Sequence, residues 1–263
     1  MIIDFHTHLF PDKLARYAMK KLDSNAGVPY DCYPTREELL KNMAKNGVDK
    51  SVVLSIATRE HQHESIFNFA AEINSDNLIA FGSVMPQTHS AAEYVQAVAA
   101  TGLKGLKFHP ALQRFKPEDK INFPVYDLAR SLGLIVLFHA GWDPTYPKEL
   151  YCSVQSVIEV EKNFPGLKIV AAHMGGLKLS REVLETLVGR DVYFDTAWTA
   201  EPWIDDRTME SIIKKHGAEK ILFGSDFPWN NPKREIEIIN RLSIPASDKK
   251  LIMGGNAIRI LNL

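Results

Sequence analysis

Four short segments of this chain carry side chains that can bind a divalent metal ion, and each follows an aliphatic run. They are Asp4-Phe5-His6-Thr7-His8, Phe138-His139-Ala140-Gly141, Ala172-His173-Met174-Gly175-Gly176 and Gly224-Ser225-Asp226-Phe227-Pro228. Each His or Asp is therefore expected where a strand ends and a loop begins. Imidazoles and a carboxylate that converge from separate strands form a metal site with an open coordination position. The pattern indicates a metal-dependent enzyme.

The chain contains two His-x-His pairs, and their surroundings differ. His6 and His8 end the run Met1-Ile2-Ile3, and on a strand positions i and i+2 share a face, so both rings can face one ion. His61 and His63 stand among charged residues at the start of an expected helix, where i and i+2 do not face each other. We interpret the second pair as solvated surface.

The composition limits the classes of function. With 263 residues, 45% of them hydrophobic, the chain can bury a large core. The net charge of −1 leaves no basic footprint for nucleic acid. Cys32 and Cys152 form no CxxC pair, and no secretory signal or membrane-spanning run is present. We expect a cytoplasmic protein that acts on a small molecule, binds neither nucleic acid nor membrane, and is either monomeric or a homodimer.

Short apolar runs recur along the chain at the spacing of a strand–helix repeat. The eight strand candidates are residues 2–3, 51–55, 78–84, 103–108, 134–138, 168–172, 192–195 and 220–224. Between them, Thr35-x-x-Glu38 and Ser90-x-x-Glu93 read as helix capping boxes. No linker or shift in composition divides the chain, so residues 1–263 are expected to form one domain. The pattern predicts an α/β fold, a single-domain (β/α)8 TIM barrel. A doubly wound sheet is the alternative, but its Gly-rich phosphate turn is missing.

Active sites of such barrels lie at the C-terminal ends of the strands. Five of the nine histidines are expected on this rim, together with one carboxylate: His6, His8, His109, His139, His173 and Asp226. Zinc accepts imidazole and carboxylate ligands and lowers the pKa of a bound water to about 7. Asp226 can bind the ion and also take a proton from the attacking water. His173 either completes the metal shell or stands outside it and stabilises an oxyanion.

The ordered motifs resemble the amidohydrolase superfamily. They include Ile3-Asp4-Phe5-His6-Thr7-His8, Gly105-Leu106-Lys107-Phe108-His109-Pro110 and the closing Gly254-Gly255-Asn256-Ala257. More narrowly, the chain is similar to the amidohydrolase-related (amidohydrolase 2) branch, which includes aminocarboxymuconate-semialdehyde decarboxylase, resorcylate decarboxylases and lactonases. The similarity runs from residue 1 to residue 262. It implies metal ligands at His6, His8, His139 and Asp226, and a catalytic histidine at His173. We expect one Zn2+ per chain, with Mn2+ or a second metal as alternatives.

The chain departs from the decarboxylases of this branch after its first strand. Those enzymes carry a long insertion there, which supplies an arginine that clamps a substrate carboxylate. Here the segment from Leu9 to Pro34 is short, and Arg16 is its only arginine. The resemblance to decarboxylases is therefore weaker in the part that would hold the substrate.

Lys107 has two interpretations. In binuclear members of the superfamily a lysine on the fourth strand is carbamylated and bridges two metals. Lys107 shares strand parity with His109, so both can face the barrel interior. The second interpretation is a buried lysine paired with a carboxylate such as Asp195. His109 is expected to contact the substrate rather than the metal.

Further substrate contacts are expected from the loops behind these strands. Aromatic rings there can wall a site for a ring-shaped substrate, or they can be ordinary loop packing. These residues are Trp142, Tyr146, Trp198 and Trp229. Arg59 and Arg114 follow the second and fourth strands and are candidate carboxylate anchors, because a guanidinium matches carboxylate geometry.

The leading hypothesis is a zinc-dependent hydrolase that attacks the carbonyl C–O or C–N bond of a lactone or amide. The alternative is a metal-dependent, non-oxidative decarboxylase of a small unsaturated or aromatic acid. A TatD-type nuclease also begins with a His-x-His strand, but that family favours Glu-Thr-Asp where this chain has Gly-Ser-Asp-Phe-Pro. A non-catalytic metal-binding barrel is the fourth reading, since fold alone does not imply function.

Overall fold

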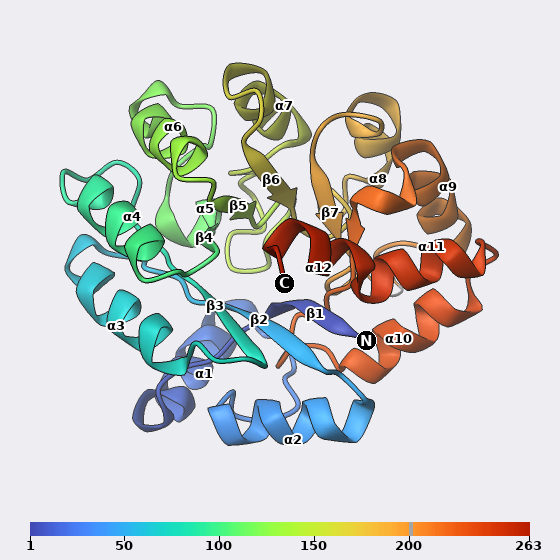
Figure 1. The fold of residues 1–263 in the computed structure, drawn as a ribbon, viewed down its shortest axis with the longest axis horizontal. Coiled ribbons are helices and arrows are strands. Elements are labelled where there is room, and N and C mark those ends of the chain that lie inside the picture. The colour runs from blue at the N-terminus through green and yellow to red at the C-terminus, as the bar shows by residue number, and fades with distance from the viewer. Residues whose placement is uncertain (200–201) are drawn as a thin grey trace.

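Eight parallel strands form the centre of the molecule in the computed structural model, which describes residues 1–199 and 202–263 (Figure 1). In chain order they are β1 (Ile3–Thr7), β2 (Lys50–Leu54), β3 (Leu78–Phe81), β4 (Gly105–Phe108), β5 (Ile135–Phe138), β6 (Lys168–Ala171), β7 (Tyr193–Asp195) and β8 (Ile221–Leu222). Consecutive strands pair in parallel from β1 to β3 and from β4 to β8. Helices surround the strands on the outside.

Hydrogen bonds across two further seams close these strands into a barrel. Between β3 and β4, Gly82 N donates to Gly105 O at 2.9 Å. Between β1 and β8, Phe5 N donates to Phe223 O at 2.7 Å. A closed barrel leaves no exposed strand edge. The (β/α)8 barrel predicted from the sequence is therefore confirmed, and the doubly wound sheet is excluded.

The helices alternate with the strands in the order that the sequence predicts. They are α1 (Asp12–Ala26), α2 (Arg36–Asn46), α3 (His63–Ile73), α4 (Ala91–Ala100), α5 (Pro110–Gln113), α6 (Phe123–Ser131), α7 (Val154–Asn163), α8 (Ser180–Glu182), α9 (Asp206–His216), α10 (Pro232–Arg241), α11 (Ala246–Lys250) and α12 (Asn256–Leu261). Two π-helical turns, Val183–Leu187 and Leu251–Gly255, follow α8 and α11. Within the described residues, every helix is too short or too polar to span a bilayer.

The last helix, α12, closes the N-terminal end of the barrel. Ala257, Ile260 and Leu261 belong to the same apolar cluster as the inward-facing side chains of the strands, and α12 crosses the barrel centre in Figure 1. The chain comes so near β1 that a Cβ atom on Gly254 would lie 2.5 Å from Met1 O. This end is packed with apolar side chains, so polar chemistry belongs to the opposite end.

The structure differs from the sequence predictions at one helix start and at one histidine. Thr35 caps α2 by accepting a hydrogen bond from Glu38 N, which confirms one half of the predicted capping box; Thr35 N donates to Tyr33 O instead of to Glu38. Ser90 does not cap α4; its hydroxyl donates to Glu60 at 2.8 Å and lies 3.1 Å from His63 Nδ1. The interpretation of His63 as solvated surface is wrong, because its ring is buried beneath the loop after β3. Its Nε2 accepts a hydrogen bond from Met85 N at 2.7 Å.

Candidate metal centre

A β-bulge in β1 includes His6 and precedes His8. The register between β1 and β2 shifts between Asp4 and Thr7, so β1 holds an extra residue there. A bulge re-aims the side chains beyond it and is frequent beside active sites. His6 and His8 are both buried at the C-terminal end of β1, where barrel enzymes carry their active sites.

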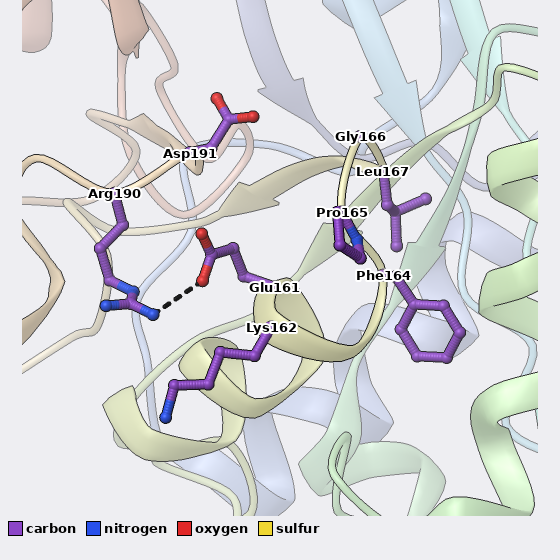
Figure 2. A pocket seen from close by; sticks show the side chains of 8 residues that line it. All are labelled: Glu161, Lys162, Phe164, Pro165, Gly166, Leu167, Arg190 and Asp191. Carbon is purple, nitrogen blue, oxygen red and sulfur yellow. Dashed lines mark hydrogen bonds and ion pairs between the residues drawn. The ribbon is translucent and has the colours of Figure 1, made fainter.

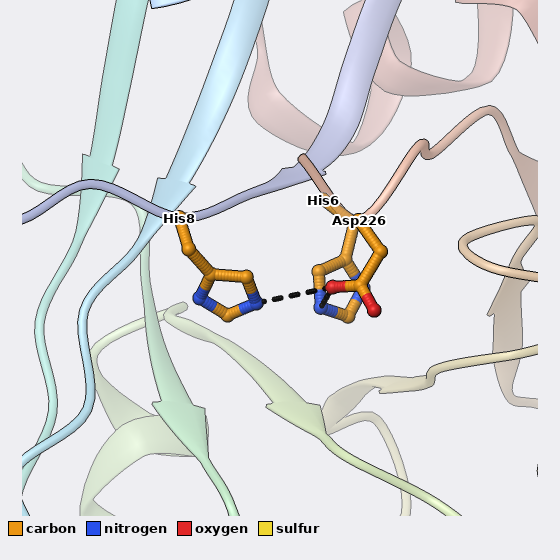
Figure 3. A group of neighbouring side chains, drawn as sticks. All are labelled: His6, His8 and Asp226. Atoms are coloured by element: carbon orange, nitrogen blue, oxygen red, sulfur yellow. Dashed lines mark ion pairs between the residues drawn. The ribbon is translucent and has the colours of Figure 1, made fainter. Parts of the chain in front are cut away.

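The carboxylate of Asp226 lies against both of these rings (Figure 3). Asp226 Oδ1 is 3.4 Å from His6 Nε2 and 3.3 Å from His8 Nε2. Asp226 follows β8 with a φ of 70°, a conformation that costs free energy in a residue other than glycine. One ligand atom from each residue falls within 4.8 Å of the others, so the three can surround one ion.

The hydrogen bonds of the two rings show which nitrogens are free for a metal. His6 Nδ1 lies 2.8 Å from Asp195 Oδ2, and His8 Nδ1 lies 2.8 Å from Leu54 O. Both partners are acceptors, so each Nδ1 carries the hydrogen and each Nε2 presents a lone pair. Two lone pairs and a carboxylate oxygen therefore face one another, and a cation satisfies all three.

Electrostatics favours the protonation states that bind metal. Burial lowers the pKa of His6 well below its usual value, and the neighbouring Lys107 lowers this pKa further. Burial alone would raise the pKa of Asp226, but the adjacent imidazoles of His6 and His8 hold this pKa well below its usual range. Neutral imidazole and ionised carboxylate are the forms that ligate a divalent ion. The donor set fits such an ion.

A second pair of histidines meets beside the first group. His139 Nδ1 lies 3.0 Å from His173 Nε2. His173 Nδ1 faces Ala197 O at 2.7 Å, and His139 Nε2 faces Trp142 O at 3.2 Å. These outer nitrogens carry the hydrogens, so the two inner nitrogens present lone pairs to each other. The pair requires a cation or a proton between its rings, and His173 is held with a φ of 58°.

Lys107 of β4 reaches the first group from the opposite side of the barrel. Its Nζ is fully buried and lies 3.2 Å from His6 Nε2. Burial lowers the pKa of Lys107 to about 8, although Asp195 and Asp226 act in the opposite direction. Among the described residues, its ammonium forms no direct ion pair with Asp195 or any other carboxylate. The expected lysine–Asp195 pair is therefore replaced by a contact with a candidate metal ligand.

His109 and Asp143 form a further buried group with His139. The rings of His109 and His139 stack at 4.2 Å with an angle of 8° between their planes. Asp143 Oδ2 lies 3.5 Å from His109 Nε2 and 3.6 Å from His139 Nε2. Asp143 was not predicted from the sequence; the available signal is its position four residues after His139, in the same loop.

The aromatic residues expected around the site are only partly gathered there. The ring of Trp229 lies 5.3 Å from that of His8, so Trp229 borders the first group. The ring of Trp142 instead packs beneath Lys178, whose Nζ is 3.1 Å from its centre. Trp142 and Trp198 both contact Trp203, at 5.7 and 5.5 Å between ring centres. Trp203 and Lys178 were not singled out from the sequence.

The two candidate carboxylate anchors are both exposed. Arg114 stacks over Tyr146 at 4.0 Å, and its Nη1 lies 3.4 Å from the hydroxyl oxygen of Tyr151. Arg59 begins the 3-10 turn Glu60–Gln62 (η1) and makes no side-chain contact that links it to the histidines within the described chain. Neither arginine is brought into the metal group by these contacts.

A surface cavity at the other end of the barrel is separate from this chemistry (Figure 2). It lies where α7 ends and where the chain enters β6 and β7. Arg190 and Glu161 on its wall form an ion pair at 2.9 Å, and Phe164 borders it. Residues at the N-terminal face of such barrels generally serve stability rather than catalysis. We therefore assign the candidate site to the histidine rim.

Comparisons with known proteins identify the family and the fold of the chain. A family model described as "Amidohydrolase" matches residues 3–263. A search of curated proteins found no match. Among solved structures, 5-carboxyvanillate decarboxylase LigW from Sphingomonas paucimobilis is 18% identical, with a TM-score of 0.76 and coverage of 100% of this chain and 99% of that one.

Two further structures show the same fold. A dihydroxybenzoic acid decarboxylase from a Polaromonas species, with bound manganese, is 15% identical, with a TM-score of 0.74 and coverage of 100% and 97%. An uncharacterized TIM-barrel protein, Bb4693 from Bordetella bronchiseptica, is 18% identical, with a TM-score of 0.80 and coverage of 99% and 98%. Because the family model spans nearly the whole chain, the protein belongs to the amidohydrolase family and is an enzyme of the amidohydrolase superfamily.

Proposed function

We propose that the protein is a divalent-metal-dependent hydrolase that cleaves the carbonyl C–O or C–N bond of a small lactone or amide. The observation that carries this proposal is the convergence of His6 Nε2, His8 Nε2 and Asp226 Oδ1, all three without a hydrogen of their own. Such a group holds an ion and leaves coordination positions for water and substrate.

In this proposal His6, His8 and Asp226 hold one ion, and His139 contributes a further nitrogen. We propose zinc because imidazole and carboxylate ligands suit it, and the manganese recorded for the Polaromonas relative makes that ion the comparison in any assay. When bound, the ion polarises the substrate carbonyl and lowers the pKa of a water molecule to about 7. Lys107 could bridge two ions only as a carbamate, and metal content distinguishes this arrangement.

The protein's own groups position and move protons. Asp195 Oδ2 accepts a hydrogen bond from His6 Nδ1 and so fixes the direction of His6 Nε2. Asp226 stays ionised because its pKa is held low, so its carboxylate can accept a proton from the attacking water. His173, when protonated at Nε2, can donate to the oxygen on which negative charge develops.

The distribution of basic side chains favours hydrolysis over decarboxylation. A decarboxylase needs a clamp for the substrate carboxylate, but among the described residues Lys107 is the only lysine or arginine that is buried. Arg16, the only arginine of the Leu9–Pro34 segment, is exposed on α1, 6.0 Å from the ring of Tyr33.

Decarboxylation is the second candidate because solved relatives of the same fold carry this activity in their names. At 15–18% sequence identity, these structures show a shared fold but do not identify the substrate of this protein. In that reaction a proton is delivered to carbon as carbon dioxide leaves. The metal group could then bind the substrate carboxylate itself, which would remove the need for an arginine clamp.

Isotope labelling separates the two reactions. A panel of lactones, amides and aromatic acids is first screened for turnover with zinc and with manganese. An active substrate is then run in 18O-labelled water, and the product mass is read. Hydrolysis introduces one solvent oxygen into the acid formed. An unlabelled organic product accompanied by carbon dioxide would refute the hydrolase proposal and establish the decarboxylase.

A further inference from the structure

Asp143 is a buried carboxylate that the hydrolysis scheme leaves without a role. It is 5% exposed and lies in the loop after β5. Its Oδ1 accepts a hydrogen bond from Thr145 N at 2.8 Å, which fixes the carboxylate within its own loop. Its Oδ2 is directed to two histidine nitrogens, at 3.5 Å from His109 and 3.6 Å from His139.

The remaining contacts of the two histidines determine where their hydrogens lie. His109 Nδ1 accepts from Leu112 N at 3.4 Å, so the hydrogen of a neutral His109 ring is on Nε2. His139 Nε2 faces only acceptors, Trp142 O and the Asp143 carboxylate, so it also carries a hydrogen. The two nitrogens that carry hydrogens therefore both lie within 3.6 Å of one carboxylate oxygen.

The same three residues could in principle hold a metal ion, since their ligand atoms lie within 4.8 Å of one another. The stacking of the rings opposes this. An imidazole binds an ion in the plane of the ring, along its nitrogen lone pair, and the planes of His109 and His139 are nearly parallel at 4.2 Å. An ion between them would lie far out of both planes. The geometry suits a hydrogen-bond acceptor instead.

We infer that Asp143 is a positioning residue that orients two histidines of different function, His139 of the proposed metal centre and His109 at its edge. For His139 it forms a carboxylate–histidine–metal relay, which keeps the hydrogen on Nε2 and leaves Nδ1 free. For His109 it keeps the hydrogen on Nε2 and fixes the orientation of a ring that stacks on His139. The role of His139 as a metal ligand rests on the proposed function. The positions of the hydrogens on the rings of His109 and His139 do not depend on it.

The test measures which ring nitrogen of His109 and of His139 carries the hydrogen. The full chain is loaded with zinc, labelled with 15N in its histidine rings, and examined by long-range proton–nitrogen NMR at neutral pH. His109→Asn and His139→Asn identify the signals. Both residues are expected as Nε2–H tautomers in the wild type, and Asp143→Asn is expected to shift the Nε2 and Hε2 resonances of both rings. A wild-type His109 with its hydrogen on Nδ1 overturns the inference, even if Asp143→Asn fails to fold.

Metal affinity gives a second readout that needs no turnover. Competition with a chelator should show zinc binding weakened about 10- to 100-fold in Asp143→Asn, the usual effect of removing a ligand's hydrogen-bond partner. Glu149→Gln is the matched control, because it makes the same acid-to-amide change at an exposed position of the same loop. Unchanged affinity together with unchanged Nε2 and Hε2 resonances in Asp143→Asn would overturn the inference. Loss of one zinc ion from both Asp143→Asn and His109→Asn would also overturn the inference, because it would identify His109, His139 and Asp143 as a metal site.

Discussion

His139 Nδ1 lies 3.0 Å from His173 Nε2, and the hydrogen-bond partners of the two rings leave neither of these nitrogens with a hydrogen. Two facing lone pairs at this distance repel unless a positive charge lies between them. The pair is 34 residues apart in sequence and comes from neighbouring strands. His173 is therefore placed where it can pass a proton or contact an ion, and mutation distinguishes these roles.

Replacement of His173 by alanine should separate metal binding from turnover. If His173 acts as an acid or oxyanion donor, His173→Ala retains the metal content of the wild type while kcat falls about 100-fold or more. Elemental analysis and steady-state kinetics on the same preparation measure both quantities. Loss of the metal in this variant would make His173 a ligand and contradict the assigned role.

Metal content should depend on the first histidine pair. We expect about one zinc or manganese per chain in the wild type, and near-complete loss of metal and activity in the His6→Ala/His8→Ala double variant. His61→Ala is the control, because His61 belongs to the other His-x-His pair and is exposed. Metal retained by the double variant would defeat the assignment.

Lys107 determines whether the centre holds one ion or two. Lys107→Met keeps the length of the side chain but cannot form a carbamate. In a mononuclear centre this variant retains the metal content of the wild type. A wild-type content near two that falls toward one in Lys107→Met would establish the bridged arrangement, and elemental analysis in the presence of bicarbonate is the measurement.

Much of the fold followed from local sequence patterns. The apolar runs gave the strands, and the barrel rule placed His6, His109, His139 and His173 on one rim before any contact was known. These predictions succeeded because the C-terminal ends of the strands converge in a closed parallel barrel, regardless of the loop sequences. The capping prediction at Thr35 held for the same local reason.

What the sequence did not show depends on contacts between distant segments. The bulge in β1 depends on pairing with β2, and the burial of His63 depends on the loop after β3. Asp143 looks like an ordinary turn residue until the ring of His109, from another strand, is placed beside it. The sequence does not identify the substrate, because the loops expected to contact it carry no motif that indicates one.

His216 provides a prediction about stability that is independent of the metal. Its Nδ1 accepts from Gly189 N at 3.1 Å, its Nε2 donates to Val192 O at 2.7 Å, and its ring stacks on Phe194. Burial lowers the pKa of His216 to about 4, so the folded state binds fewer protons than the unfolded state between pH 4 and pH 6.5. Its contribution to the free energy of unfolding is present above pH 6.5 and is lost as the pH falls through this window.

The loss should approach about 3 kcal/mol at most, since each pKa unit corresponds to about 1.4 kcal/mol. Denaturant unfolding across this pH range measures it. His216→Gln is the comparison, because an amide can accept from Gly189 and donate to Val192 without titrating. The difference between the two curves isolates His216 from the carboxylates. Parallel curves would show that His216 does not titrate as expected.

The pH dependence of the rate should distinguish the two reaction classes. Asp226 stays ionised over any practical assay range because its pKa is held well below its usual value, so a rise near neutrality cannot come from Asp226. For hydrolysis, kcat/KM should increase with pH through about 7, where water on a bound ion loses a proton. Lys107, whose pKa is about 8, and the buried Asp4, whose pKa burial raises to about 7, are two protein groups that could also change the rate in this pH range. In Lys107→Met, kcat/KM should therefore still increase through about pH 7. Loss of this increase in Lys107→Met would show that Lys107 is the titrating group. A rate that falls from acid to alkaline pH would instead indicate a required proton donor, as decarboxylation needs.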